Sequence, residues 1–328
     1  MGGILVLSRE DLRSLLAFED YVEAVSEAFR LHAQGKAVTP PPLQLDAVDG
    51  TFHVKAASLP IGNGYAAFKT NANFPNNRRR AGLPTIQGAV LLMDATTGTP
   101  LALLDSIEIT LKRTGAATAL AARHLARPDS SVATICGCGE QGKIQLLALR
   151  HVLDIRQAYA WDVNRNAAAA YAVQMSAEHG IEVVATPDLS SATLQSDVIV
   201  TCTTSTVPFL GPDDVRSGTF VAAVGADNPQ KSELHPGLMA RAVVVTDILE
   251  QCIVMGDLHH AVGAGAMTRE GVHAELGALI SGAATGRTRP DEITIFDSSG
   301  TGIQDVAAAV RAYQLALARR SGSRVELS

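Results

Sequence analysis

The first third of the chain shows two hydrophobic periodicities. Residues 10–34 repeat apolar side chains at helical spacing and end near Gly35, which predicts N-terminal helices. Residues 51–70 and 85–105 are rich in β-forming residues and are interrupted by Gly and Pro, which predicts an antiparallel sheet. Residues 106–125 are dense in small side chains, so we expect a helix that a neighbouring backbone or a ligand can approach closely.

From residue 131 onward, short apolar runs alternate with alanine-rich helical segments. The predicted strands are 132–135, 157–161, 181–184, 198–202, 220–224, 242–246 and 293–296. This alternation indicates a doubly wound α/β fold, a parallel sheet with helices on both faces. The tail from residue 302 is amphipathic, and we expect it to pack on the first domain. Its apolar stripe comprises Ile303, Val306, Ala307, Val310, Tyr313 and Leu317.

A G-x-G-x-x-G array, Gly137, Gly139 and Gly142, directly follows the apolar run 132–135. The first glycine permits a tight turn, the second lets backbone approach a pyrophosphate, and the third allows close packing of helix on strand. The helix that begins near Gln141 offers free N–H groups to phosphates. Asp162 ends the next predicted strand, where a carboxylate can accept the ribose hydroxyls and repel a 2′-phosphate. The loop therefore predicts NAD(H) binding, with NADP(H) disfavoured.

Composition narrows the function classes further. The 328 residues allow two domains, 47% of them are hydrophobic, and no apolar run is long enough to span a membrane. The N-terminus lacks the basic region and cleavage site of a signal peptide, so we expect a soluble, cytoplasmic protein. A net charge of −6 disfavours nucleic-acid and anionic-membrane partners, and we expect Arg78–Arg80 to form a solvated loop.

Metal binding is not predicted. Cys136 and Cys138 flank Gly137, and the sequence has no second Cys pair or C-x-x-C to complete a zinc site. The histidines at 259, 260 and 273 lack the spacing of known metal motifs.

Beyond the glycine loop, the sequence resembles the ornithine cyclodeaminase/mu-crystallin family over nearly its whole length. The motifs that carry the resemblance are FKTNANFPNN (68–77), GLPTIQG (82–88), KRTGAATALAARHLA (112–126), SDVIVTCTTS (196–205), VGADNPQKSEL (224–234) and EITIFDSSGTGIQDVAAA (292–309). The family implies a Rossmann dinucleotide-binding domain, here 116–302, and a discontinuous α+β substrate-binding and dimerisation domain, here 1–115 with 303–328. It also implies a homodimer that transfers hydride at the α-carbon of an amino or imino acid.

The resemblance also assigns site residues. Lys69 matches the family's active-site lysine, which contacts the substrate carboxylate or carbonyl, and Arg113 matches the arginine that binds the substrate carboxylate. Asp227 matches the catalytic acid/base. Positions that line the cofactor are matched by Thr85, Glu140, Gln141, Thr203, Lys231 and Ser298.

Two departures bear on the substrate. The family often has an arginine after a proline pair in the first domain, whereas this chain reads Pro40-Pro41-Pro42-Leu43. Cyclodeaminases carry a glutamate near the position of Lys55–Ala56, where this chain offers a lysine. A small, neutral or acidic substrate side chain is therefore favoured.

The leading hypothesis is an NAD(H)-linked amino-acid dehydrogenase, similar to alanine dehydrogenases, or a ketimine reductase. An ornithine-type cyclodeaminase that recycles NAD is the alternative within the family. A non-catalytic binding protein, as among mu-crystallin relatives, is the alternative of another class. The presence of Lys69, Arg113 and Asp227 together argues against it, because binding alone needs no acid/base.

Overall fold

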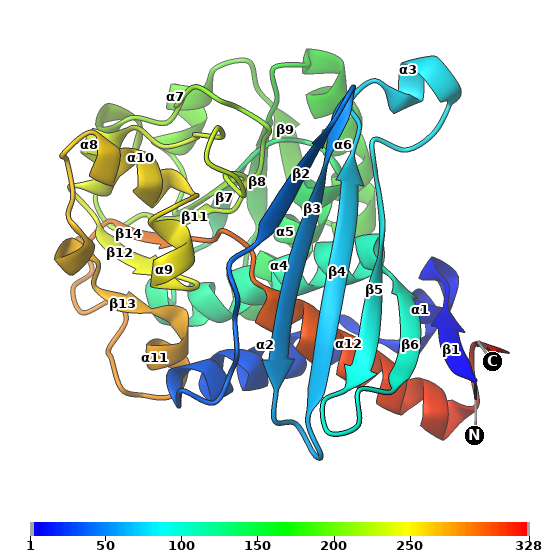
Figure 1. Cartoon of the computed structure of the whole chain (residues 1–328). Coiled ribbons are helices and arrows are strands. Elements are labelled where there is room, and N and C mark those ends of the chain that lie inside the picture. Colours follow the sequence, from blue (N-terminus) through cyan, green and yellow to red (C-terminus); the bar gives the residue numbers. More distant parts are fainter. Residues whose placement is uncertain (1–2, 327–328) are drawn as a thin grey trace. The chain divides into compact units, whose positions relative to one another are not determined.

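The computed structural model describes residues 3–326, and the chain divides into two compact units (Figure 1). One comprises Met1–Ala116 with Thr301–Ser328, and the other comprises Ala117–Gly300. The chain leaves the first unit within helix α4 (Ser106–Leu125) and re-enters it at helix α12 (Gly302–Arg319). No helix within the described range is long and apolar enough to cross a membrane.

The first unit is built on a seven-stranded sheet in the order β15-β1-β6-β5-β4-β3-β2. The antiparallel part predicted from the sequence is present: β3 (Gly50–Leu59), β4 (Tyr65–Asn73), β5 (Ile86–Asp94) and β6 (Pro100–Asp105). Three strands were not predicted: the edge strands β2 (Leu43–Ala47) and β15 (Ser323–Val325), and β1 (Ile4–Leu7), which lies between β15 and β6. β2 is exposed at every position and β15 has only three residues, so neither has a burial pattern to detect.

Helices cover one face of this sheet. α12 packs against α2 (Phe18–Ala33) and across strands β3, β4 and β5, so the tail does pack on the first unit (Figure 1). The predicted stripe is wrong in two details: residues 302–310 are buried on all sides, and Leu317 is exposed. The unit also contains α1 (Arg9–Leu15), the short α3 (Asn77–Ala81) and the first part of α4. Arg78–Arg80 therefore lie in a helical turn, not in the predicted loop, although they are exposed as expected.

The second unit contains an eight-stranded parallel sheet in the order β13-β12-β14-β11-β10-β7-β8-β9. All seven predicted strands are present within two residues: β7 (Val132–Cys136), β8 (Gln157–Trp161), β9 (Glu182–Ala185), β10 (Val198–Thr201), β11 (Phe220–Ala223), β12 (Val243–Thr246) and β14 (Thr294–Asp297). The unpredicted β13 (Ala274–Glu275) has two residues. Because β7 pairs with both β8 and β10, the strand order reverses there, and such switch points are where ligands bind in open α/β sheets.

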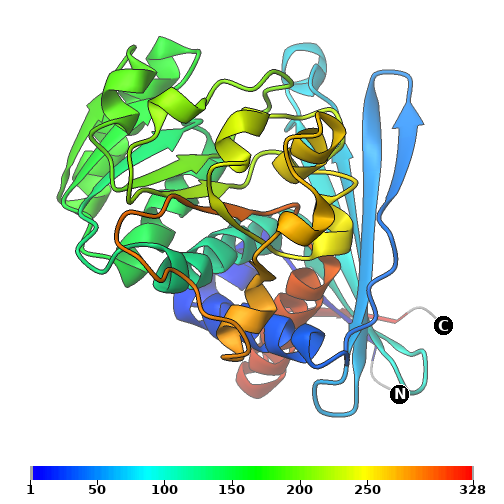
Figure 2. The same cartoon turned by 90° about the vertical axis from the view of Figure 1, so that its left-hand side faces the viewer.

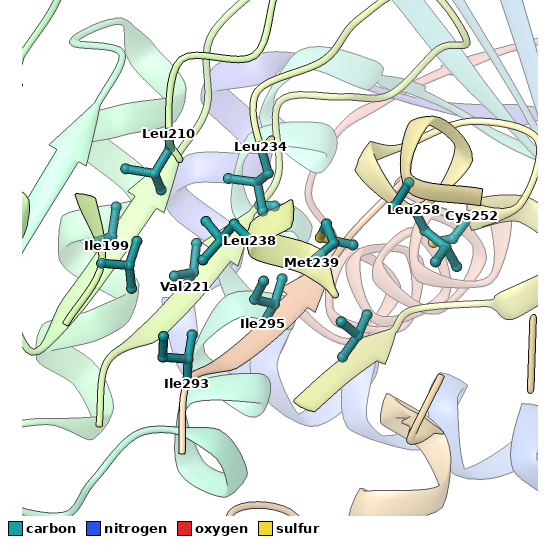
Figure 3. Close-up of a cluster of buried hydrophobic side chains, with 14 of the residues drawn as sticks. Ile199, Leu210, Val221, Leu234, Leu238, Met239, Cys252, Leu258, Ile293 and Ile295 are labelled. Carbon is teal, nitrogen blue, oxygen red and sulfur yellow. The ribbon is translucent and has the colours of Figure 1, made fainter. Parts of the chain in front are cut away.

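Helices flank this sheet (Figure 2): α5 (Glu140–Val152), α6 (Arg165–His179), α7 (Leu189–Thr193), α8 (Pro236–Met239), α9 (Leu249–Cys252), α10 (Asp257–Gly263) and α11 (Leu276–Ile280). Strands β10, β11 and β14 are buried at every position, as expected for parallel strands covered on both sides. Their side chains Ile199, Val221 and Ile295 pack with Leu238 and Leu258 of the neighbouring helices (Figure 3). This core fixes the carboxyl ends of the strands, where the loops of the candidate site begin.

Candidate active site

The glycine loop lies between β7 and α5, at the switch point of the second unit's sheet. Gly137 has φ +105°, a conformation that favours glycine, and a Cβ on the buried Gly142 would lie 2.2 Å from the Gly137 carbonyl oxygen. Gly139 is the N-cap of α5, and a Cβ there would meet nothing within 4 Å. The first and third glycines are thus required by the fold, while the second leaves open space above the first turn of α5.

A cavity of about 380 Å³ opens beside this loop. Its floor includes the partly stacked rings of Trp161 and Phe209, whose centroids are 5.2 Å apart. The lining residues are Gly137, Gly139, Trp161, Asp162, Val163, Cys202, Thr203, Thr204, Ser205 and Phe209. An aromatic floor, a hydroxyl-bearing wall and a carboxylate at a helix N-terminus suit a nucleotide.

Asp162 is held in place by the loop it faces. One carboxylate oxygen accepts the Cys138 N–H at 2.9 Å, and the other accepts the Asn164 N–H at 2.8 Å. Asn164 caps α6, and Arg165 begins that helix. The carboxylate therefore lines the cavity in a fixed orientation, as a ribose contact requires.

The other predicted cofactor residues have varied environments. Thr203 lines the cavity, whereas Glu140 forms an exposed ion pair with Lys143, and Gln141 is half-buried in the first turn of α5. Ser298 is buried and donates to Asp247 at 3.2 Å. Thr85 belongs to the first unit, where its carbonyl accepts the Phe74 N–H.

Asp227 lies in the loop that follows β11. Its half-exposed carboxylate forms an ion pair with Lys231 at 2.7 Å, and the same ammonium donates to the Gly225 carbonyl at 3.2 Å. The Lys231 carbonyl is hydrogen-bonded to a ring nitrogen of His260 on α10 at 2.8 Å. The predicted acid/base and a predicted cofactor residue are thus direct partners, and His260, which sequence reasoning considered only as a metal ligand, anchors their loop.

In the first unit, Lys69 and Arg113 are brought together by a buried carboxylate. Lys69 Nζ lies 2.7 Å from one Asp305 oxygen, and Arg113 Nε lies 3.0 Å from the other. Arg113 also donates to Gln304 at 2.8 Å, and Lys69 donates to Thr110 at 3.3 Å. The cluster joins β4, α4 and α12.

Burial and mutual repulsion shape the charges of this cluster. Burial, followed by repulsion from Arg113 and Lys55, lowers the pKa of Lys69 to about 7, against the attraction of Asp305. Burial alone would raise the pKa of Asp305, but attraction by Lys69 and Arg113 outweighs it and holds that pKa below its ordinary value. Lys55 is also buried, on β3 directly opposite Lys69.

Sequence reasoning missed Asp305 and Gln304. The available signal was chemical: two cations expected in one buried site require a counterion, and Asp305 is the one acidic residue of α12, in its first turn. No group of three or more His, Cys, Asp or Glu side chains between residues 3 and 326 could hold a metal ion.

The parallel sheet, the glycine loop at its switch point and the fixed Asp162 define a dinucleotide-binding α/β protein. The chain belongs to the ornithine cyclodeaminase/mu-crystallin family, whose model matches residues 4–320. The predicted resemblance and fold class are thereby confirmed.

Three similar proteins illustrate the membership. An alanine dehydrogenase of Archaeoglobus fulgidus is 40% identical over 98% of both chains. The structure of an archaeal alanine dehydrogenase dimer with bound NAD is 40% identical, with a TM-score of 0.93 and 99% of both chains covered. The Δ1-pyrroline-2-carboxylate reductase of Thermococcus litoralis, solved with NADH and L-proline, is 33% identical, with a TM-score of 0.94 and coverage of 98% of this chain and 100% of the other.

Proposed function

We propose that this chain, an NAD-dependent oxidoreductase of amino or imino acids, interconverts a small 2-amino acid and the corresponding imino acid. The reaction is that of an alanine dehydrogenase or a ketimine reductase. The observation that carries this proposal is the buried cluster of Lys69 and Arg113 around Asp305. The similar alanine dehydrogenase and pyrroline-carboxylate reductase support the reaction class.

The cluster suits a substrate carboxylate. Lys69 and Arg113 both form ion pairs with Asp305, so two cations face one carboxylate, and one added carboxylate would balance them. Arg113 would supply a planar donor and Lys69 a point charge beside the reacting carbon. Because the Arg113 donors already contact Asp305 and Gln304, the substrate would share the guanidinium with them.

The cavity beside the glycine loop suits NAD(H). The first turn of α5 would receive the pyrophosphate, Asp162 the ribose hydroxyls, and Trp161 with Phe209 the apolar part of the nucleotide. When bound, the nicotinamide supplies or accepts the hydride. We assign proton transfer at the substrate nitrogen to Asp227, which Lys231 holds in place.

Lys55 favours dehydrogenase or reductase chemistry over cyclodeamination. It contributes positive charge to the cluster where a cyclodeaminase is expected to carry a glutamate. The δ-ammonium of ornithine would meet a like charge there, and like-charge contacts in a buried site are strongly unfavourable. Substrates with a neutral or acidic side chain avoid this repulsion.

The test is NADH consumption with three substrate sets: pyruvate with ammonia, pyruvate with methylamine, and Δ1-pyrroline-2-carboxylate. We expect turnover with at least one set, and none when the amine is omitted from the first two. Release of ammonia from ornithine with no net change in NADH would instead identify a cyclodeaminase. NADH binding without turnover of any substrate would identify a binding protein, and either result would overturn the proposal.

We further propose a homodimer formed through the outer face of the first unit's sheet. The inner face is covered by α12, while Leu43, Leu45, Phe68 and Leu103 on the strands remain substantially exposed. The similar archaeal alanine dehydrogenase is a dimer. Exposed apolar patches of this kind mark association surfaces.

Light scattering of Leu103→Glu tests this arrangement, with Val173→Glu on α6 as the matched control at another exposed apolar position. We expect the native chain and Val173→Glu to be dimers and Leu103→Glu to dissociate at micromolar concentration. A native monomer, or an unaffected Leu103→Glu dimer, would contradict the proposed surface.

A further inference from the structure

Three carboxylates lie buried in series behind the loop that carries Asp227. Glu233, Asp257 and Asp297 each have 0% exposed surface. A buried carboxylate is costly unless hydrogen bonds replace its lost water. Here many of the donors are backbone N–H groups of neighbouring loops, so each carboxylate fixes the position of another segment.

The series begins at the end of β14. The two oxygens of Asp297 accept the N–H groups of Asp257 and Leu258, at 3.2 and 2.9 Å, which anchors the start of α10. One oxygen of Asp257 accepts the N–H groups of Glu233 and Leu234, at 2.7 and 2.9 Å. The segment that contains Glu233 is therefore tied to the core of the sheet through two carboxylates.

At the other end, Glu233 holds two loops of the candidate site at once. One oxygen accepts both the N–H and the hydroxyl of Thr203, at 2.6 and 2.7 Å, and the other accepts the Gly225 N–H at 2.9 Å. Thr203 follows β10 and lines the nucleotide cavity, whereas Gly225 begins the loop that carries Asp227. The Glu233 carboxylate lies so close to Gly225 that a Cβ added to this glycine would be 2.4 Å from a carboxylate oxygen.

We propose that Glu233 is a positioning residue that couples occupancy of the nucleotide cavity to the placement of Asp227. A ligand that shifts or stiffens Thr203 acts on the same carboxylate that holds Gly225, two residues before Asp227. The functional meaning of the coupling rests on the proposed function, which gives Asp227 its role, but the coupling can be measured without any substrate.

The electrostatics favour a functional role over a stabilising one. Burial and repulsion by Asp257 raise the pKa of Glu233 to about 7, against the opposing effect of its bonds from Thr203. A buried carboxylate with a raised pKa is a weak source of folding stability, and strongly shifted groups concentrate at functional sites.

Hydrogen–deuterium exchange with ADP-ribose measures the coupling. ADP-ribose carries the adenosine and pyrophosphate but no nicotinamide, so it cannot protect the Asp227 loop through a nicotinamide contact. In the native chain we expect slower exchange both at 202–205 and at 224–231 when ADP-ribose binds. Native protection confined to 202–205 would overturn the inference.

Glu233→Gln provides the specific disruption. It keeps the shape, but its NH₂ group must face an N–H donor, which breaks one of the two links. We expect protection to persist at 202–205 and to be lost at 224–231. Asp197→Asn is the control, because Asp197 is a nearly buried carboxylate that accepts the N–H groups of Ser131 and Val132 at the amino ends of β7 and β10, away from the carboxyl ends that carry the site. In Asp197→Asn, ADP-ribose should still slow exchange at both 202–205 and 224–231. If Glu233→Gln also keeps the protection of both segments, the coupling is refuted.

Gly225→Ala disrupts the contact between Gly225 and Glu233 by changing Gly225 instead of Glu233. It is the alternative variant if Glu233→Gln does not fold. Its added methyl group must displace the carboxylate, so the same loss of protection is expected. Gly263→Ala on α10 is the control, since a Cβ there meets nothing within 4 Å. If ADP-ribose still slows exchange at 224–231 in Gly225→Ala, as in the native chain, the inference is contradicted.

A kinetic split separates positioning from general destabilisation. With a substrate from the panel above, Glu233→Gln should lower kcat about tenfold to a hundredfold, the range of one charge-assisted hydrogen bond, with little change in KM. Its ADP-ribose affinity, followed by fluorescence of the single Trp161, should stay within about threefold of the native value.

If hydrogen–deuterium exchange behaves as expected and no substrate is turned over, the coupling stands and the proposed function fails. An unchanged kcat would overturn the inference.

Discussion

The first unit buries Lys69 and Arg113 against Asp305, whereas the second unit buries Glu233, Asp257 and Asp297 with backbone N–H groups among their donors. Burial moves the pKa of Lys69 down to about 7 and that of Glu233 up to about 7. In both residues, Lys69 and Glu233, the loss of water favours the neutral form.

The difference lies in what each cluster gains from a ligand. Around Asp305, the two cations Lys69 and Arg113 outnumber the single carboxylate and would be balanced by an added anion, so the cluster favours binding a carboxylate. Around Glu233, both oxygens already accept N–H donors, so that carboxylate holds loops instead of recruiting a ligand. A buried charge is therefore best interpreted through its partners: an excess of cations indicates recognition, and saturation by amides indicates positioning.

The largest effect is expected at Asp305. Asp305→Asn would leave Lys69 and Arg113 buried without their carboxylate, which should lower the free energy of unfolding by about 3–5 kcal/mol. Urea unfolding measures this change. Asp20→Asn, which removes one of the two acidic partners of the part-exposed Arg311, should cost only about 1 kcal/mol or less. If Asp305→Asn and Asp20→Asn lower the free energy of unfolding equally, burial does not determine the strength of the ion pairs of Asp305.

A smaller effect, confined to substrate, is expected at Arg113. Arg113→Lys keeps the charge but loses the planar donor set that contacts Asp305 and Gln304, so KM should rise about tenfold or more while NADH affinity stays the same. Steady-state kinetics and fluorescence titration report the two quantities. A raised dissociation constant for NADH would place Arg113 with the cofactor instead.

The pH dependence of kcat/KM tests Lys69. Since the pKa of Lys69 in the free protein is about 7, its ammonium is present below pH 7 and is lost as the pH rises. Recognition of an anionic substrate should then weaken, and kcat/KM should fall severalfold from about pH 7 to 9. Lys69→Arg stays charged throughout, so this decline should disappear even if the overall activity is lower. A decline that persists in Lys69→Arg belongs to another group.

The smallest effect is expected at Asp162. Asp162→Ala removes a ribose acceptor and a charge that repels the 2′-phosphate, so the preference for NADH over NADPH should narrow by about 1–2 kcal/mol. Fluorescence titration with NADH and with NADPH measures the difference between their binding free energies. A native preference for NADPH would contradict the role of this carboxylate.

The sequence predicted what local patterns determine. Parallel strands buried on both faces appear as continuous apolar runs, and the glycine loop has a fixed spacing, so the second unit's sheet and its ligand edge were predicted. The two-residue β13 and the exposed β2 carry no such pattern and were missed.

The clusters were harder to predict, because they depend on residues far apart in the chain. Lys69 and Asp305 meet only because α12 returns to cover β4, and Glu233 reaches Thr203 and Gly225 only because β10 and β11 are neighbours. Family resemblance pointed to Lys69, Arg113 and Asp227 individually, but the counterion and the positioning carboxylates appeared only with the tertiary structure.

The central claim, that hydride transfer on an amino or imino acid depends on proton transfer by Asp227, is tested most directly by Asp227→Asn. This variant keeps the shape of the side chain and removes the base. On the substrate identified with the panel, kcat should fall about 10²–10⁴-fold, the usual contribution of general acid–base catalysis, while NADH affinity is unchanged. A near-native kcat, or loss of NADH binding together with activity, would contradict the account.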